Sequence, residues 1–168
     1  SKAMVDADGE ACFLSRRAVV AMGSDHGGFD LKSKLMRFVQ SLGLSVRDCG
    51  TYDKQSCDYP DFALAASQQI ALGQSDCAII IDGAGIGSCM AANKVPGVLA
   101  ATVHNVATAK NSREHNGANA LCLGSGQMTE SQAFEIVEAW LSTPFGGGRH
   151  GRRVDKIRGI EQCFVKQI

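Results

Sequence analysis

The segment DGAGIG, residues Asp82–Gly87, places three glycines directly after a carboxylate and an apolar run. Glycines at this spacing let main-chain N–H groups converge on an anion or on an oxygen that gains negative charge during a reaction. The spacing is G-x-G-x-G, so it does not match the G-x-G-x-x-G dinucleotide fingerprint. The segment predicts an anion-binding loop, and a tight strand-to-helix turn remains the alternative.

Cationic side chains gather after a second glycine run, PFGGG: Arg149, His150, Arg152 and Arg153. The forked guanidinium group of arginine suits phosphate or carboxylate. The alternative is the solvated start of a charged helix. His26 beside Asp25, after the first apolar run, could orient an anion or a proton, or could be a plain surface histidine.

Short apolar runs alternate with helical periodicities along the chain. We expect strands over 18–22, from 44, and over 77–81, 98–103 and 120–123, and helices over 30–42, 61–72, 88–93, 105–115, 129–141 and 149–167. This order predicts an α/β fold with a parallel sheet and helices on both faces. Such sheets bind ligands at the carboxyl ends of their strands, where we expect SDHGG, DGAGIG and SREHN to lie.

Composition narrows the class of protein. The chain has 168 residues, enough for one domain, and its 17 Lys+Arg balance 17 Asp+Glu, which argues against a nucleic-acid partner. No apolar run approaches the roughly 20 residues of a membrane span, and no signal peptide is expected. We expect a flexible extension over 1–17 and a single domain over 18–168.

The seven cysteines form no C-x-x-C pair, which argues against zinc-ribbon and thioredoxin folds. They predict free thiols in a reducing, cytoplasmic setting, with a disulfide framework as the alternative. No His/Cys/Asp cluster has metal-ligand spacing, so neither a metal nor a cofactor is expected.

Five ordered segments, GSDHGGFDLK, CDYPDFA, GAGIG…AANKVPG, REHNGAN and TPFGGGRHGRRVDKI, resemble the ribose-5-phosphate isomerase B and galactose-6-phosphate isomerase family. The resemblance implies a Rossmann-like three-layer fold with a C-terminal helix used in dimerisation. It also implies a homodimer or a dimer of dimers, active sites at the subunit interface, and cofactor-free aldose–ketose isomerisation of a sugar phosphate.

Matching positions imply contacts with the substrate. Asp25 would handle a hydroxyl; His26, Arg149 and Arg153 would face the phosphate; and Tyr59, Ala84 and Gly85 would line the pocket. His115 would assist ring opening and Asn116 would hydrogen-bond the enediolate, with further donors from the Gly83–Gly87 main chain. As alternatives, Tyr59 could anchor a loop, and His115 and Asn116 could cap a helix.

The chain departs from the family at four positions. Asp82 stands where members carry a catalytic cysteine, and Ser88 where another branch has a glutamate base. Ala84 replaces a usual threonine, and Gly126 an arginine that is often present. We hypothesise that Asp82 moves the proton between C1 and C2 of the sugar, since a carboxylate can serve as such a base. The alternative is a loop carboxylate bonded to the main chain or to Lys94.

The predicted function is interconversion of ribose 5-phosphate and ribulose 5-phosphate through an enediolate. Two alternatives stay open. The substrate could be another sugar phosphate or an unphosphorylated acidic sugar, because Gly126 and Ala84 alter the expected anion site. The chain could also be a catalytically silent sugar-phosphate binder, because the cysteine is absent.

Overall fold

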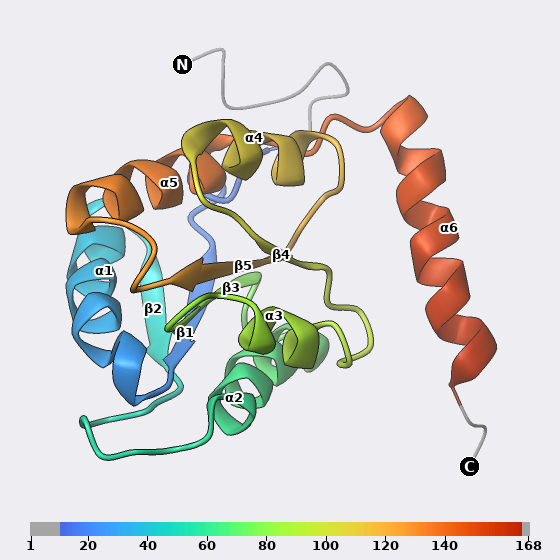
Figure 1. Cartoon of the computed structure of the whole chain (residues 1–168). Helices are drawn as coiled ribbons and strands as arrows, with labels where there is room; N and C mark the ends of the chain where they lie inside the picture. Colours follow the sequence, from blue (N-terminus) through green and yellow to red (C-terminus); the bar gives the residue numbers. More distant parts are fainter. Residues whose placement is uncertain (1–10, 166–168) are drawn as a thin grey trace.

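The computed structural model describes residues 11–165, which form a five-stranded, all-parallel sheet (Figure 1). The strand order is β2-β1-β3-β5-β4, and each neighbouring pair is parallel. The strands are β1 (Val19–Ser24), β2 (Ser45–Asp48), β3 (Cys77–Asp82), β4 (Ala100–Thr102) and β5 (Ala120–Gly124). The predicted α/β fold with a parallel sheet is confirmed.

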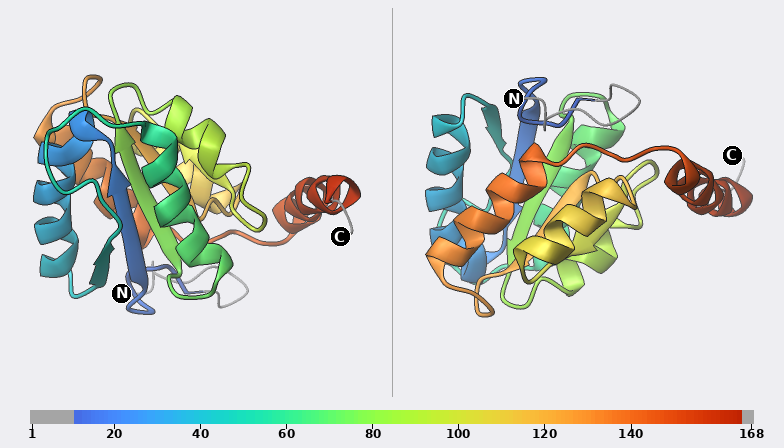
Figure 2. Two further views of the ribbon diagram at one scale, coloured as in Figure 1. Left: turned by 90° about the horizontal axis from the view of Figure 1, so that it is seen from below. Right: turned by 90° about the horizontal axis from the view of Figure 1, so that it is seen from above.

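Helices cover both faces of the sheet (Figure 2). The helices on the sheet are α1 (Phe29–Ser41), α2 (Tyr59–Ala71), α3 (Gly87–Ala92), α4 (Val106–Glu114) and α5 (Glu130–Ser142), with a short 3-10 helix, η2 (His26–Gly28), before α1, whereas α6 (Arg149–Phe164) lies apart. α1, α4 and α5 share one face, and α2 and α3 share the other.

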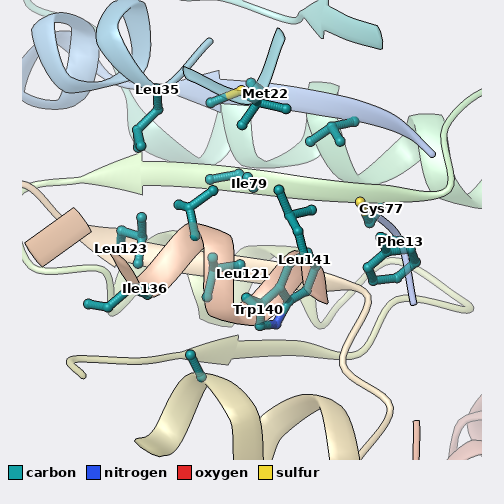
Figure 3. Close-up of a cluster of buried hydrophobic side chains, with 14 of the residues drawn as sticks. Phe13, Met22, Leu35, Cys77, Ile79, Leu121, Leu123, Ile136, Trp140 and Leu141 are labelled. Carbon is teal, nitrogen blue, oxygen red and sulfur yellow. The ribbon is translucent and has the colours of Figure 1, made fainter. Parts of the chain in front are cut away.

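β3 occupies the centre of the sheet, and all six of its residues are buried. Its side chains alternate between two hydrophobic clusters, with Ile79 and Ile81 facing the first and Ala78 and Ile80 the second. The first cluster contains the larger side chains, including Trp140 (Figure 3), and the second is rich in alanine. Burial on both faces explains why the strand is a continuous apolar run.

The described part of the expected flexible extension is packed. Cys12 and Phe13 are buried, and the Phe13 ring lies 5.2 Å from the Trp140 ring. The guanidinium of Arg113 sits 4.1 Å above the Phe13 ring. For residues 11–17 the expectation of a flexible segment is therefore wrong, because an aromatic side chain anchors them to α5. Residues 1–10 lie outside the described residues.

Local sequence signals explain several helix ends. The Thr129 hydroxyl accepts from Gln132 N–H, and the Gln132 side chain accepts from Thr129 N–H, so the capping box predicted before α5 is confirmed. Gly43 follows α1 with a φ of 90°, the left-handed conformation that glycine permits. The expected helices match the observed ones to within a few residues. The strand expected over 98–103 is observed only at Ala100–Thr102.

α6 extends away from the rest of the chain (Figures 1 and 2). Val154 is its one buried residue, and Ile157, Ile160 and Phe164 are exposed. A groove of about 580 Å³ lies between this helix and the segment 93–99. The helix ends at Phe164, and the last residues of the expected helix, 166–167, lie outside the described residues.

All seven cysteines are free, as predicted. Cys12, Cys77 and Cys122 are buried, and Cys89 is half-buried. Across residues 11–165, no helix is both long and apolar enough to cross a membrane.

Candidate functional site at two edges of the sheet

Asp25 and Asp82 come at the carboxyl ends of the neighbouring strands β1 and β3. The Asp25 N–H donates to the Ile81 carbonyl at 3.2 Å, which holds the two strand ends together. The Asp25 carboxylate accepts from the Gly28 N–H at 3.0 Å and so caps η2. The predicted site residue therefore lies at the expected edge, where it also stabilises the turn into α1.

His26 lies beside Asp25 and faces the loop that precedes α2. Its Nδ1 accepts from the Cys57 N–H at 3.2 Å. A neutral ring bonded in this way carries its proton on Nε2. The contact therefore fixes the ring orientation and leaves Nε2 as a donor.

Tyr59 begins α2 and lies against the glycine loop. A Cβ atom added at Gly87 would stand 2.5 Å from the Tyr59 ring, so only glycine permits this contact. The Tyr59 side chain remains partly exposed at this edge. The structure thus brings Tyr59, Asp25, His26 and the loop 82–88 together at the carboxyl edge.

The Asp82 carboxylate points into its own loop. One oxygen accepts from the Gly85 N–H and the other accepts from the Ser88 N–H at 3.0 Å. The residue is 4% exposed, and Lys94 is not its partner among the ion pairs of residues 11–165. This matches the alternative stated from the sequence, in which Asp82 is a loop carboxylate hydrogen-bonded to the main chain. One of the loop donors expected for a substrate oxyanion, the Gly85 N–H, is thereby occupied by Asp82.

The glycine loop is also bonded to the turn after β5. The Ser125 N–H donates to the Asp82 carbonyl at 2.8 Å, and the Gly126 N–H donates to the Gly83 carbonyl at 3.0 Å. A Cβ atom at Gly126 would lie 3.2 Å from that same Gly83 oxygen. Gly126 therefore allows a close approach of two loops, at the position where an arginine is often present in the family.

His115 and Asn116 lie at the opposite, amino-terminal edge of the sheet. They follow α4 and precede β5, and the Asn119 N–H donates to the Leu99 carbonyl at the start of β4. The expectation that SREHN lies at the carboxyl edge is therefore wrong, because this segment leads into a strand rather than out of one. His115 is the C-cap of α4, and its Nδ1 lies 2.9 Å from Asn111 Nδ2.

The cationic cluster of α6 lies next to His115. The His150 ring stacks on the His115 ring at a centroid distance of 4.3 Å, and Arg149 and Arg153 are close enough to affect its charge. Partial desolvation lowers the pKa of His150, and the positive charges of His115, Arg149 and Arg153 lower it further. A bound anion would reduce the repulsion between the positive charges of these side chains.

One chain therefore carries two separate groups of site residues. β5 has five residues, which span about 16 Å at the usual rise per residue, and this length separates the two edges. Asp25, His26, Tyr59 and Asp82 form the carboxyl-edge group. His115, Asn116, Arg149 and Arg153 form the amino-edge group.

Two buried cations support these groups, and the sequence analysis did not single them out. Lys32, 1% exposed, donates to the Asp48 carboxylate at 2.5 Å and to the Thr51 carbonyl at 2.6 Å. Arg113 donates to the Thr143 carbonyl at 3.2 Å and to the Ala118 carbonyl at 2.6 Å. Lys32 lies three positions before Leu35 and seven before Val39, on the buried face of α1, and that spacing was the available signal.

Residues 11–165 contain no group of three or more His, Cys, Asp or Glu side chains arranged to hold a metal ion. The side chains at the two edges can support proton transfer by histidine and carboxylate groups, hydrogen bonding to hydroxyl groups, and anion binding by arginine and histidine.

The fold corresponds to that of a known class of sugar isomerases. The model of the Ribose/Galactose Isomerase family matches residues 20–157, so the chain belongs to this family of aldose–ketose isomerases.

Individual relatives are similar over nearly their whole length. Ribose-5-phosphate isomerase B of Escherichia coli K12 is 39% identical over 143 residues, which cover 85% of this chain and 96% of that protein. The solved ribose-5-phosphate isomerase B of Clostridium thermocellum superposes with a TM-score of 0.86 at 44% identity, covering 87% and 99% of the two chains. The enzyme from Mycoplasma genitalium, solved with bound ribulose-5-phosphate, has a TM-score of 0.82 at 42% identity and covers 86% and 96%.

Proposed function

We propose that the chain interconverts ribose 5-phosphate and ribulose 5-phosphate. The observation that carries this proposal is the 42% identity, over 86% of this chain, to an enzyme solved with ribulose-5-phosphate bound. Residues that the resemblance assigns to substrate contact lie at the two edges of the sheet, which supports the proposal, although Asp82, Ala84, Ser88 and Gly126 depart from the family pattern. The proposal adds a substrate and a mechanism to the family assignment.

The complete site is proposed to form between two copies of the chain. In one chain the carboxyl-edge and amino-edge groups are about the length of a strand apart, too far to hold one pentose phosphate between them. α6 carries half of the amino-edge group and exposes Ile157, Ile160 and Phe164. A second copy that covers this apolar face would bring its own carboxyl edge to the amino-edge group.

Within such a site, Arg149, Arg153 and His26 would hold the phosphate. Arginine forks bind phosphate oxygens in pairs, and the Nε2 proton of His26 is free of its Cys57 contact. His115 would assist ring opening at the other end of the sugar, and Asn116 would donate to the enediolate oxygen. Asp25 would bond a sugar hydroxyl through the carboxylate oxygen that does not cap η2.

Proton transfer by Asp82 is proposed to require an exchange of partners at the glycine loop. Hydrogen bonds from the Gly85 and Ser88 N–H groups hold both carboxylate oxygens in the loop. If the developing enediolate oxygen takes over these two N–H donors, the carboxylate is released toward the sugar. The same donors would then stabilise the oxyanion, and Asp82 would move the proton between C1 and C2.

Solvent deuterium uptake tests this mechanism. Ribose 5-phosphate in deuterium oxide should gain label at C2 with the wild-type protein and lose this exchange by about 10²–10⁴-fold with Asp82→Asn. Asp82→Cys supplies the thiol found at this position in other family members and is the matched control for a restored base. Exchange by Asp82→Asn at the wild-type rate would show that Asp82 is not the base.

A catalytically silent sugar-phosphate binder is the second candidate, and the two main-chain bonds of Asp82 favour it. In that case the carboxylate would keep the Gly85 and Ser88 N–H groups for itself, and these two donors would not reach an oxyanion. Isothermal titration would then detect binding of ribose 5-phosphate while no label enters C2. A panel of pentose, tetrose and hexose phosphates and acidic sugars, scored by isomerisation rate, separates both candidates from an isomerase of another substrate.

A further inference from the structure

Residues 11–17, which we call the anchor segment, pack at the amino edge of the sheet just before β1. They precede the part of the chain that the family model matches. Phe13 is 4% exposed, and its ring packs on the Trp140 ring of α5 at an interplanar angle of 32° (Figure 3). The Leu14 N–H donates to the Leu141 carbonyl at 2.9 Å. The anchor segment is therefore attached to the end of α5.

The other end of the anchor segment is attached to the start of β1. The Arg16 guanidinium lies 3.1 Å from one oxygen of Asp76, and the second oxygen accepts from the Val19 N–H at 2.8 Å. The Ala18 N–H donates to the Phe13 carbonyl at 3.0 Å. Phe13 thus stands between two points of attachment, so its ring is held in one place.

The Phe13 ring covers the guanidinium group of Arg113, the last arginine of α4. The Cζ atom of Arg113 lies 4.1 Å from the ring centroid, and Arg113 is 4% exposed. A ring face at this distance attracts a guanidinium cation and keeps water away from it. Hydrogen bonds are stronger where water is excluded, so Phe13 stabilises those that Arg113 donates.

Arg113 closes the turn that carries His115 and Asn116. Its main-chain carbonyl accepts from the Gly117 N–H at 3.0 Å, and its Nη1 donates to the Ala118 carbonyl at 2.6 Å. Main chain and side chain of one residue therefore bind the far side of the turn. The position of the Arg113 guanidinium and the conformation of the turn are coupled through these two bonds.

The same guanidinium also binds the linker that leads to α6. Arg113 Nε donates to the Thr143 carbonyl at 3.2 Å, at the end of α5. Further along the linker, the Gly146 N–H donates to the Glu114 carbonyl at 2.8 Å. Both bonds join the linker to the last turn of α4, so they fix the start of α6 relative to the turn after α4.

We propose that Phe13 and Arg113 are positioning residues for the isomerase reaction: Phe13 holds the Arg113 guanidinium, which sets the turn of His115 and Asn116 against the arginines of α6. This inference rests on the proposed function, because it assigns a task in that reaction to two side chains outside the residues that contact the sugar. A misplacement of about 1 Å far from the reacting atoms can lower a rate about 10²-fold. An aromatic side chain in the anchor segment would therefore contribute to the activity without touching the substrate.

Steady-state kinetics of the full chain test the role of Phe13. Phe13→Ala should lower kcat/KM for ribose 5-phosphate by about 10-fold to 10²-fold. We expect kcat to fall because the turn after α4 is displaced, and KM to rise because the arginines of α6 are displaced.

Phe38→Ala is the matched control, because the Phe38 ring stacks on the Phe134 ring at 4.6 Å where α1 meets α5. It also removes one ring of an aromatic pair, and both variants are assayed well below their unfolding temperatures. Phe38→Ala should leave kcat and KM of the folded protein unchanged. Equal kinetic constants for Phe13→Ala and Phe38→Ala would overturn the proposal.

A double-mutant cycle tests whether Phe13 acts through Arg113. Arg113→Lys keeps the charge but lacks the fork that reaches two carbonyl groups. The variant that combines Phe13→Ala with Arg113→Lys should therefore lose no more activity than Arg113→Lys alone. If the two losses multiply, the residues act independently and the proposed coupling is wrong.

Histidine NMR gives a readout that does not depend on activity. The chain has four histidines, and His26 lies at the carboxyl edge. Phe13→Leu, a milder change, and Arg113→Lys, which keeps the Phe13 ring, should both shift the ring signals of His115 and His150 and leave those of His26 in place. Unshifted His115 and His150 signals would overturn the positioning role. A wild-type protein that shows no isomerisation would refute the proposed function, and the histidine signals would still decide whether Phe13 positions the amino-edge group.

Discussion

The carboxyl-edge and amino-edge groups of this chain are held in place by very different amounts of packing. At the carboxyl edge, Asp25, Asp82 and Gly126 are bonded to neighbouring loops, and Lys32 lies buried beneath the turn after β2. At the amino edge, the arginines lie on α6, whose one buried residue is Val154. The chain by itself thus organises one half of a site, whereas the other half is carried by a helix that has few contacts of its own.

The difference has an energetic basis. Apolar burial contributes roughly 25 cal/mol per Å², and α6 leaves Ile157, Ile160 and Phe164 outside any core. Exposed apolar side chains along a helix that stands apart are typical of an interaction surface. Four predictions follow from the contrast between the two edges, in order of decreasing effect.

The largest effect is expected on isomerase activity when one variant loses a side chain at the carboxyl edge and a second variant loses one at the amino edge. His26→Ala and His115→Ala should each lower isomerase activity by about 10³-fold, because each removes a polar group from every site. Mixing the two variants under exchange conditions should restore about a quarter of wild-type activity, since half of the dimers are mixed and each mixed dimer has one intact site. Activity is measured by the rate of ribulose 5-phosphate formation.

The control for this experiment is a mixture of His26→Ala with Tyr59→Ala, two changes at the same edge. That mixture should regain no activity if the site is shared between copies. A result in which neither mixture recovers would show that the two edges do not complete each other.

A glycine pair compares packing at the two edges. Gly85 and Gly148 both have positive φ values, 78° and 53°. A Cβ at Gly85 would lie 2.9 Å from Gly124 N, whereas one at Gly148 meets nothing within 4 Å. Gly85→Ala should therefore lower the free energy of unfolding by about 3 kcal/mol, and Gly148→Ala by only about 1 kcal/mol. Urea unfolding at one fixed protein concentration measures both, and equal losses would refute the contrast.

Lys32 provides a test with a smaller expected effect. Lys32→Met leaves the Thr51 carbonyl and the Asp48 carboxylate without their buried donor and should lower the free energy of unfolding by about 2 kcal/mol. The loss is smaller than for a fully buried ion pair because Asp48 is 34% exposed. The matched change at the other edge is Lys156→Met on α6, an exposed position, which should change stability by no more than about 0.5 kcal/mol. Thermal unfolding of both variants would contradict the prediction if the losses were similar.

The smallest effect concerns pH and the attachment of α3. Because the pKa of Cys89 is lowered to about 6 from an ordinary 9.0, the unfolded chain binds more protons in this interval. The Cys89 contribution to stability is therefore complete above about pH 9 and is lost as pH falls through about 6. As the pH rises from about 6 to about 9, amide hydrogen exchange in α3 should slow relative to the Cys89→Ser variant. Exchange in α6 should not depend on the Cys89 substitution.

Much of this architecture could be predicted from periodicity and local motifs. Apolar runs at 77–81 and 120–123 lie in the centre of the sheet because uniform hydrophobicity requires cover on both faces. Thr129 with Gln132 specified the start of α5, since both halves of a capping box lie within one helical turn. The carboxyl-edge placement of Asp25 and the glycine loop follows from their position directly after strands.

Other features depend on contacts between distant segments, which no local pattern encodes. Phe13 packs on Trp140, so residues 11–17 belong to the folded part of the chain. His115 lies at the amino edge with His150, and the order of helix and strand around it was the signal that the sequence analysis did not use.

The amino-acid sequence by itself determined the parallel α/β fold, the family resemblance and the inventory of polar groups, because these depend on residue types and short-range spacing. Only the tertiary structure decided what each group touches. It directed the Asp82 carboxylate to the Gly85 and Ser88 amides, and it placed Phe13 against Trp140. Such partners are chosen by the packing of whole elements, since hydrogen bonds need positions accurate to a fraction of an ångström.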